Sequence, residues 1–205
     1  QVVYRETVST PAEGAAVFEH EIGGRDHYAA VTLRVEPLAR GRGNHFASRV
    51  PTDSIPEFVY AAVETGVREA AFGGVLMGYP VADVATTLIA LEQREGQSSD
   101  IAFKACTMKA FAQGIQAAGP VLMEPIMNAE VLVPEEFLGG VVGDLSARRG
   151  KVQKITPRKN LAVVDAQVPL SGMFGYSRAV RTLSQGRATF TMQFSHFEVM
   201  TGSGA

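Results

Sequence analysis

The hydrophobic positions of the first 50 residues predict a β-rich segment, in which Val2, Tyr4 and Val8 suit strands. The longest of these strands runs from Tyr28 to Val35. The adjacent glycines of Ile22-Gly-Gly-Arg-Asp-His27 predict a tight turn, because glycine takes positive φ at little steric cost. Residues 37–44 predict a loop, and residues 46–50 predict a short strand. The chain therefore opens with a β-rich part that contains a glycine turn.

A helical period begins after Ser54. Pro56 suits the first turn of a helix, and Ser54 is a candidate for its N-terminal cap. Residues 81–91 then predict a well-covered strand, and Ser98-Ser99-Asp100 supplies capping groups for a second helix. The apolar positions at helical spacing are Val59, Val63, Val67 and Ala70 in the first helix and Ile101, Ala105, Met108, Ala112 and Ile115 in the second.

The order of elements changes after residue 120. Pro134-Glu135-Glu136 opens a helix with its acids at the positive end of the dipole, and Arg148-Arg149-Gly150 closes it with cations at the negative end. Tyr176 and Val180 mark the inner face of a second helix, which Gly186 ends as a left-handed residue. The predicted strands cover residues 124–133, 151–156, 161–168 and 189–194. The resulting order, β-α-β-β-α-β, is typical of a ferredoxin-like fold.

Composition is that of an ordinary globular protein. The 205 residues are 46% hydrophobic and 20% charged, which is enough for one large domain or two small ones. The net charge of −2 gives no bulk attraction for nucleic acid, so any RNA contact must come from local clusters of cations. The single Cys106 has no partner for an internal disulfide and is expected to be a small buried residue.

Signatures of catalysis, metal binding and membrane insertion are missing from the sequence. No G-x-x-x-x-G-K-[ST] phosphate loop occurs, and the four histidines lack metal-ligand spacing. Asp144 and Glu130 offer two acids without an accompanying base or nucleophile. Apolar runs end well before the roughly 20 residues of a membrane span. We therefore expect no enzyme activity, no metal and no membrane contact, and Gln1 in place of an initiator methionine leads us to expect a piece of a longer protein.

A series of different short motifs is spread along nearly the whole chain. They are Tyr4-Arg-Glu-Thr7, Gly23-Gly-Arg25 with Tyr28, Gly78-Tyr-Pro-Val81 with Asp83, Ser98-Ser99 with Ala102-Phe103-Lys104, Leu122-Met-Glu-Pro-Ile126, Pro134-Glu-Glu136, Gly143-Asp144-Leu145, Arg148-Arg149-Gly150, Met173-Phe-Gly-Tyr176 with Arg181, and Gln185-Gly-Arg187. In content and order they resemble domains IV and V of elongation factor G, the ribosomal translocase. The resemblance implies an α+β protein with a ribosomal-protein S5-like β-α-β domain at residues 1–121 and a ferredoxin-like domain at residues 122–205.

The resemblance also implies a function. Domain IV of that family reaches the decoding site and holds the tRNA–mRNA pair during translocation, and domain V contacts the large ribosomal subunit. The GTPase domain of the family lies N-terminal to these two domains, so we expect no cofactor in this chain and place GTP and Mg²⁺ in the missing N-terminal region. The expected partner is the ribosome, with its rRNA and the tRNA–mRNA pair at the decoding site. We expect a cytoplasmic monomer.

Candidate RNA-binding residues follow from the same resemblance. They are, at the domain IV tip, Gly23, Gly24, Arg25, His27, Arg94 and Gln97, and, for a large-subunit contact, Arg181 and Arg187. Arg94 stands where the common translocase has a histidine, and arginine holds phosphate at any relevant pH. Its neighbours Glu92 and Glu95 could form ion pairs with Arg94 and so weaken its contact with RNA. A base-stacking role and no role are equally open for His27, and Arg181 and Arg187 could equally lie on an ordinary solvated face.

The altered tip leaves alternatives to translocation. The first tip loop carries Glu19, Glu21 and Asp26 where the family usually has more neutral or basic residues. A paralogue that acts in ribosome recycling, or in ribosome protection of the tetracycline-resistance type, would also have a changed tip. A free-standing RNA-binding module built from the same two domains is the remaining alternative.

Overall fold

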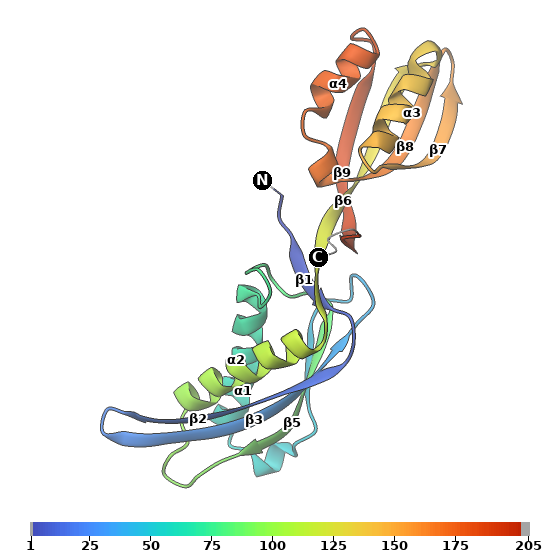
Figure 1. Cartoon of the computed structure of the whole chain (residues 1–205). Helices are drawn as coiled ribbons and strands as arrows, with labels where there is room; N and C mark the ends of the chain where they lie inside the picture. The colour runs from blue at the N-terminus through green and yellow to red at the C-terminus, as the bar shows by residue number, and fades with distance from the viewer. Residues whose placement is uncertain (1, 202–205) are drawn as a thin grey trace. The chain divides into compact units, whose positions relative to one another are not determined.

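The computed structural model describes residues 2–201, which form two compact units. The N-terminal unit comprises residues 4–123 with residues 199–201, and the C-terminal unit comprises residues 124–198 with residues 2–3. The domain boundary expected between residues 121 and 122 stays a prediction. Both units combine a sheet with helices (Figure 1), as expected for an α+β protein.

The N-terminal unit is built around a long antiparallel hairpin. Its elements are β1 (Arg5–Val8), β2 (Ala12–Ile22), β3 (Arg25–Pro37), β4 (His45–Ser48), the 3₁₀ turn η1 (Thr52–Ser54), α1 (Glu57–Gly73), β5 (Val84–Glu92) and α2 (Asp100–Ala117). Strand order in the main sheet is β2-β3-β5-β4, with β4 parallel to β5 and the other pairs antiparallel. β1 instead pairs with the first residues of β6 (Pro120–Pro134), from Arg5 opposite Met123 to Val8 opposite Pro120. The two helices pack against each other, and α2 lies along β2 and β3 (Figure 1).

The core of this unit lies between the main sheet and the two helices. Every second residue of β3 faces the helices and is buried, namely Ala29, Val31, Leu33 and Val35. Phe103 and Phe111 of α2 are fully buried in the same cluster. Alternation along β3 thus places one face of the strand in the core, and the strand predicted at residues 28–35 is confirmed.

Two sequence predictions about the helices were wrong. Ser54 does not cap α1: its hydroxyl donates to the carbonyl of Pro51, and the helix begins at Glu57 after Pro56. The predicted apolar face of α2 is rotated by about one residue, because Ile101 is 55% exposed. Of the predicted face only Ile115 is fully buried, and the buried residues of α2 are Ala102, Phe103, Cys106, Thr107, Ala110, Phe111, Gly114 and Ile115. Burial of two phenylalanines removes more apolar surface than burial of Ile101 and Met108 would, and the small residues between them allow close packing.

Other local predictions for this unit are confirmed. The Ser99 side chain caps α2 and accepts a hydrogen bond from the Ala102 N–H at 3.1 Å. Cys106 is completely buried, and its thiol donates to the carbonyl of Ala16 at 3.1 Å. Burial raises the pKa of the Cys106 thiol to about 11, so the residue is an inert packing group at neutral pH.

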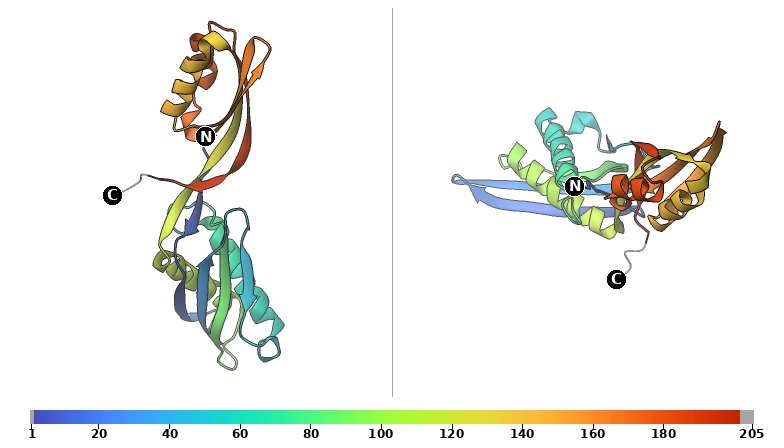
Figure 2. Two further views of the ribbon diagram at one scale, coloured as in Figure 1. Left: turned by 90° about the vertical axis from the view of Figure 1, so that its right-hand side faces the viewer. Right: turned by 90° about the horizontal axis from the view of Figure 1, so that it is seen from above.

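The C-terminal unit has the predicted order of elements. They are β6, the 3₁₀ turn η2 (Glu135–Phe137), α3 (Leu138–Ala147), β7 (Lys151–Arg158), β8 (Leu161–Pro169), the 3₁₀ turn η3 (Leu170–Gly172), α4 (Tyr176–Leu183) and β9 (Thr189–Val199). β6 lies between β8 and β9, and β7 pairs with the other edge of β8. Both helices cover the same face of this sheet (Figure 2). The β-α-β-β-α-β prediction is therefore confirmed, with a core that includes Val131, Val164, Val141, Leu145, Tyr176 and Val180.

The end of α4 differs from the prediction by one residue. Gln185 already takes a left-handed conformation, with φ of 51°, and Gly186 follows with φ of 77°. The Gly186 N–H donates to the carbonyl of Arg181 at 2.8 Å, the bond typical of a Schellman cap. Gln185, not the glycine, therefore occupies the first left-handed position after the helix.

Neither a membrane span nor a metal cluster occurs among residues 2–201. None of the helices in that range is both long enough and apolar enough to cross a bilayer. In the same residues, no three or more His, Cys, Asp or Glu side chains converge as metal ligands would.

Candidate nucleic-acid interface

The hairpin formed by β2 and β3 ends in the predicted glycine turn. The last pair of the ladder is Ile22 opposite Arg25, and the two residues between them, Gly23 and Gly24, have φ of 60° and 78°. A two-residue loop with positive φ at both positions is a type I′ turn, whose twist matches that of the strands. Arg25 therefore sits at the closed end of the hairpin, where it is exposed and has no ion pair to any residue of the described range. Figure 1 shows this end of the hairpin extending past the helices.

The loop between β5 and α2, residues 93–99, is bonded to β3. The Tyr28 N–H donates to the carbonyl of Gln97 at 2.9 Å, and the Gln97 N–H donates to the carbonyl of Arg94 at 3.0 Å. Nδ1 of His27 lies 2.7 Å from the hydroxyl of Ser99, the residue that caps α2. The structure thus brings His27 of β3 together with the loop that carries two other predicted tip residues, Arg94 and Gln97, which lie far from His27 in the sequence.

Arg94 is engaged by a carboxylate and an aromatic ring. Its Nη1 donates to Oε1 of Glu19 at 2.7 Å, and its Cζ lies 3.7 Å from the centre of the Tyr28 ring. The Tyr28 hydroxyl in turn donates to Oε2 of Glu92 at 2.9 Å. The hydrogen bond to Glu19 raises the pKa of Arg94, and that to Glu92 raises the pKa of Tyr28, so both keep their protons at neutral pH. Glu92 and Glu95 were the candidate partners that the sequence offered for Arg94, whereas the ion pair in the structure is with Glu19 of β2.

Acids outnumber cations around the two tip loops. Glu21 and Asp26 are opposite each other across the hairpin, one pair before the turn. Like charges placed opposite each other repel and weaken the ladder slightly. The tip is therefore not a broad basic patch, and any phosphate contact there depends on Arg25 and Arg94.

The two arginines predicted for the C-terminal unit have different surroundings. Arg187 forms an ion pair with Glu136 and lies over the Phe137 ring, 5.8 Å from its centre. Arg181 is exposed on α4 and forms no ion pair with any residue between 2 and 201. Arg178 is exposed one turn earlier on the same helix, and sequence reasoning missed it. Arg178 is three residues before Arg181, and this spacing in a predicted helix indicates that the two arginines share one face.

The pair Arg148-Arg149 is bonded within the unit. Arg148 forms an ion pair with Asp144 at 2.9 Å and donates to the carbonyl of Gly172 at 2.7 Å. Arg149 holds both oxygens of the nearly buried Glu124 at 3.0 Å. These arginines fix the turn before α4 to the end of α3, which supports a structural role for them.

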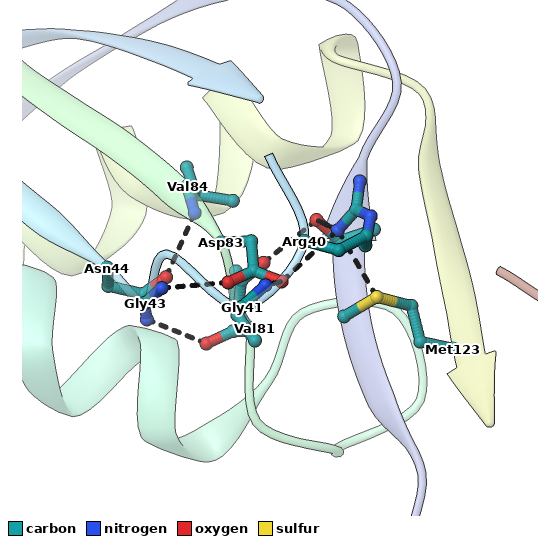
Figure 3. A network of polar contacts seen from close by, with 10 residues as sticks. Arg40, Gly41, Gly43, Asn44, Val81, Asp83, Val84 and Met123 are labelled. Atoms are coloured by element: carbon teal, nitrogen blue, oxygen red, sulfur yellow. Dashed lines mark hydrogen bonds and ion pairs between the residues drawn. The ribbon is translucent and has the colours of Figure 1, made fainter. Parts of the chain in front are cut away.

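The base of β5 is fixed by a polar network that sequence reasoning missed (Figure 3). The carboxylate of Asp83 accepts hydrogen bonds from the N–H groups of Gly43 at 2.8 Å and Gly41 at 3.2 Å, and Nη1 of Arg40 lies 3.4 Å from it. The same Nη1 also contacts the Thr7 hydroxyl at 3.1 Å. Residues 38–44, predicted only as a loop, are therefore bonded to the strand that leads to Arg94.

Asp83→Asn is expected to lower the free energy of unfolding of the N-terminal unit by about 1–2 kcal/mol. Asparagine tolerates the left-handed φ of 60° at this position, so the substitution removes the charge and keeps the backbone. Urea denaturation would measure the loss, with the exposed Asp53→Asn as the control. Equal stability of the two variants would contradict the assigned role.

Comparison with known proteins identifies the family. The sequence family described as Elongation factor G, domain IV matches residues 1–119, and the one described as Elongation factor G C-terminus matches residues 121–205. The chain belongs to the elongation factor G family. The two-domain α+β fold predicted from the motifs is thereby confirmed.

Two similar proteins show how much of a relative this chain covers. Elongation factor G of Aquifex pyrophilus is 44% identical over 198 residues, which cover 97% of this chain and 28% of that protein. A crystal structure of a Thermus thermophilus protein superimposes with a TM-score of 0.89 at 37% identity, over 98% of this chain and 30% of that one. The chain thus spans less than a third of the length of either relative.

Proposed function

We propose that this chain is the ribosome-contacting domain IV–V region of a translational GTPase that promotes tRNA–mRNA translocation. Membership of the elongation factor G family over both domains supports this proposal. In the proposal the GTPase domain, with its GTP and Mg²⁺, lies outside these 205 residues, and the chain itself performs no chemistry. The partner is the ribosome, and the factor acts as a cytoplasmic monomer.

The tip of the N-terminal unit is the proposed contact with the tRNA–mRNA pair at the decoding site. The hairpin turn at residues 23–24 and the loop at residues 93–99 present Arg25 and Arg94 from a rigid sheet. Guanidinium groups and open glycine backbone are suited to phosphate, which positions a protein on RNA without reading its sequence. Gly23, Gly24, His27 and Gln97 shape this surface. The proposed large-subunit contact consists of the exposed Arg178 and Arg181 of α4, together with Arg187, which follows that helix.

A double variant, Arg25→Ala with Arg94→Ala, tests the proposal in the intact protein. A charge-assisted contact is worth about 1.5–3 kcal/mol, so movement of tRNA and mRNA is expected to slow about tenfold or more. Ribosome-stimulated GTP hydrolysis is expected to change less than about twofold, because the proposed GTPase domain is elsewhere. Arg42→Ala, an exposed arginine of the same unit outside the tip, is the matched control.

Each outcome separates the candidate functions. Movement at the parent rate in the double variant would contradict the tip assignment. An intact protein that hydrolyses GTP but never moves tRNA would contradict translocation and favour the recycling or ribosome-protection alternative, to which the acids Glu19, Glu21 and Asp26 already point. A protein that neither hydrolyses GTP nor binds ribosomes would favour a free-standing RNA-binding module.

A further inference from the structure

Glu19 and Tyr28 both contact the guanidinium of Arg94. The guanidinium has one face on the Tyr28 ring, at 3.7 Å, and directs Nη1 to the Glu19 carboxylate, at 2.7 Å. A carboxylate and a phosphate offer the same geometry to an arginine, namely two oxygens that accept parallel N–H bonds. The structure therefore contains an internal ligand on one of the two cations of the tip.

We propose that Glu19 masks Arg94 and competes with RNA phosphate for it, so that Glu19 sets the affinity of the tip for RNA. This inference rests on the proposed function. In the bound state the phosphate replaces the Glu19 carboxylate, while the guanidinium stays on the Tyr28 ring. The released Glu19 returns to solvent.

The exposure of the pair makes this exchange possible. The side chain of Arg94 is 47% exposed and that of Glu19 is 63% exposed, so both are already hydrated and the ion pair is weak. The stack on Tyr28 does not depend on Glu19, because the tyrosine is held separately by its bond to Glu92 and by its N–H bond to Gln97. A phosphate therefore meets a preoriented guanidinium once it displaces the carboxylate.

Glu21 provides the matched control for the test. It is two residues from Glu19 on the same strand, so it points to the same face of the sheet and carries the same charge. It forms no ion pair with any residue of the described range. Substitution of either glutamate by glutamine removes one negative charge from the tip, but only Glu19→Gln removes the charged partner of Arg94.

The experiment measures binding of the intact protein and its variants to purified ribosomes in the presence of a non-hydrolysable GTP analogue. Glu19→Gln is expected to tighten binding about two- to fivefold more than Glu21→Gln, the range expected for an exposed ion pair. In an Arg94→Ala background the two glutamine variants are expected to bind equally well, because the masked group is gone.

The remaining outcomes overturn the inference in distinguishable ways. Equal tightening by Glu19→Gln and Glu21→Gln would show that only bulk charge matters, and the mask would be wrong while the proposed function stood. An advantage of Glu19→Gln that persists in the Arg94→Ala background would show direct repulsion between Glu19 and RNA, which also contradicts the mask. A parent protein that does not bind ribosomes would overturn the proposed function and the inference with it.

Discussion

Glu6→Gln is expected to lower the free energy of unfolding of the N-terminal unit by about 3–4 kcal/mol at neutral pH. The Glu6 side chain is fully buried, and its carboxylate accepts hydrogen bonds from four backbone N–H groups. One oxygen bonds Val75 and Leu76 at 2.6 and 2.7 Å, and the other bonds Met77 and Tyr79 at 2.7 and 3.0 Å. In glutamine an NH₂ group replaces one oxygen, so two buried donors lose their acceptor and face another donor.

The pH dependence of stability provides a second measure of the same group. Burial by itself raises the pKa of Glu6, but the hydrogen bonds from the four backbone N–H groups outweigh burial and hold its pKa below the ordinary value. Because the folded pKa is depressed, the stabilisation is fully present above the unfolded pKa of about 4.3 and is lost as the pH falls through the folded pKa. Glu6→Gln is expected to abolish this part of the acid sensitivity.

Amide hydrogen exchange tests the local effect directly. The N–H groups of residues 75–77 and 79 are expected to exchange much faster in Glu6→Gln, because the carboxylate is their acceptor. Glu13→Gln, an exposed glutamate on β2, serves as the control and is expected to leave both exchange and stability unchanged. Unchanged exchange of these amides in Glu6→Gln would show that the carboxylate does not hold the loop.

The contacts of Glu6 also explain why two distant motifs occur together. The motif at residues 4–7 and the motif at residues 78–83 lie against each other in the N-terminal unit. The Glu6 N–H donates to the carbonyl of Pro80 at 2.9 Å, and the Thr7 hydroxyl donates to that of Ala82 at 2.8 Å. Tyr4 and Tyr79 meet edge to face, with ring centres 5.3 Å apart. The residues of these two motifs therefore stabilise the N-terminal unit and are not part of the tip.

Features that depend on neighbouring residues could be predicted from the sequence. The turn at Gly23 and Gly24 follows from the conformational freedom of two adjacent glycines, and the Ser99 cap follows from a hydroxyl three residues before the N–H that it accepts. The β-branched residues of positions 28–35 indicated the strand that became part of β3. The strand at residues 12–22 was not predicted from the sequence, because its run of alanine, glycine and glutamate has a weak preference for sheets.

Features that depend on distant residues could not be predicted in this way. The partner of Arg94 is 75 residues away in the sequence, whereas the sequence offered only the neighbouring Glu92 and Glu95 as candidates. The inner face of α2 was also misjudged, because hydrophobicity alone does not say which small residues another backbone will approach. The partner of Arg94 and the inner face of α2 both depend on the pairing of β2 with β3 and on the packing of α2 against them.

Gly14→Ala is expected to destabilise the N-terminal unit by about 3 kcal/mol, the upper part of the range for overpacked cores. Gly14 lies on β2 beneath α2. A Cβ atom there would be 2.0 Å from the carbonyl oxygen of Ala110 and 2.4 Å from the nitrogen of Gly114. Both atoms belong to the helix backbone, so no change of side-chain rotamer relieves the clash, and α2 must move away from the sheet.

Two further glycine variants make this prediction specific. Gly114→Ala places a Cβ 3.4 Å from the nitrogen of Gly14, so a smaller loss is expected. Gly73→Ala has nothing within 4 Å and is expected to change stability by less than about 0.5 kcal/mol. Thermal denaturation of the three variants would rank them, and a Gly14→Ala protein as stable as Gly73→Ala would contradict the close approach.

Displacement of α2 by Gly14→Ala is also expected to loosen the tip. Ser99 at the start of α2 bonds both His27 and its own helix, so a shift of α2 is transmitted to β3. The amide groups of residues 28 and 97 are therefore expected to exchange faster in Gly14→Ala.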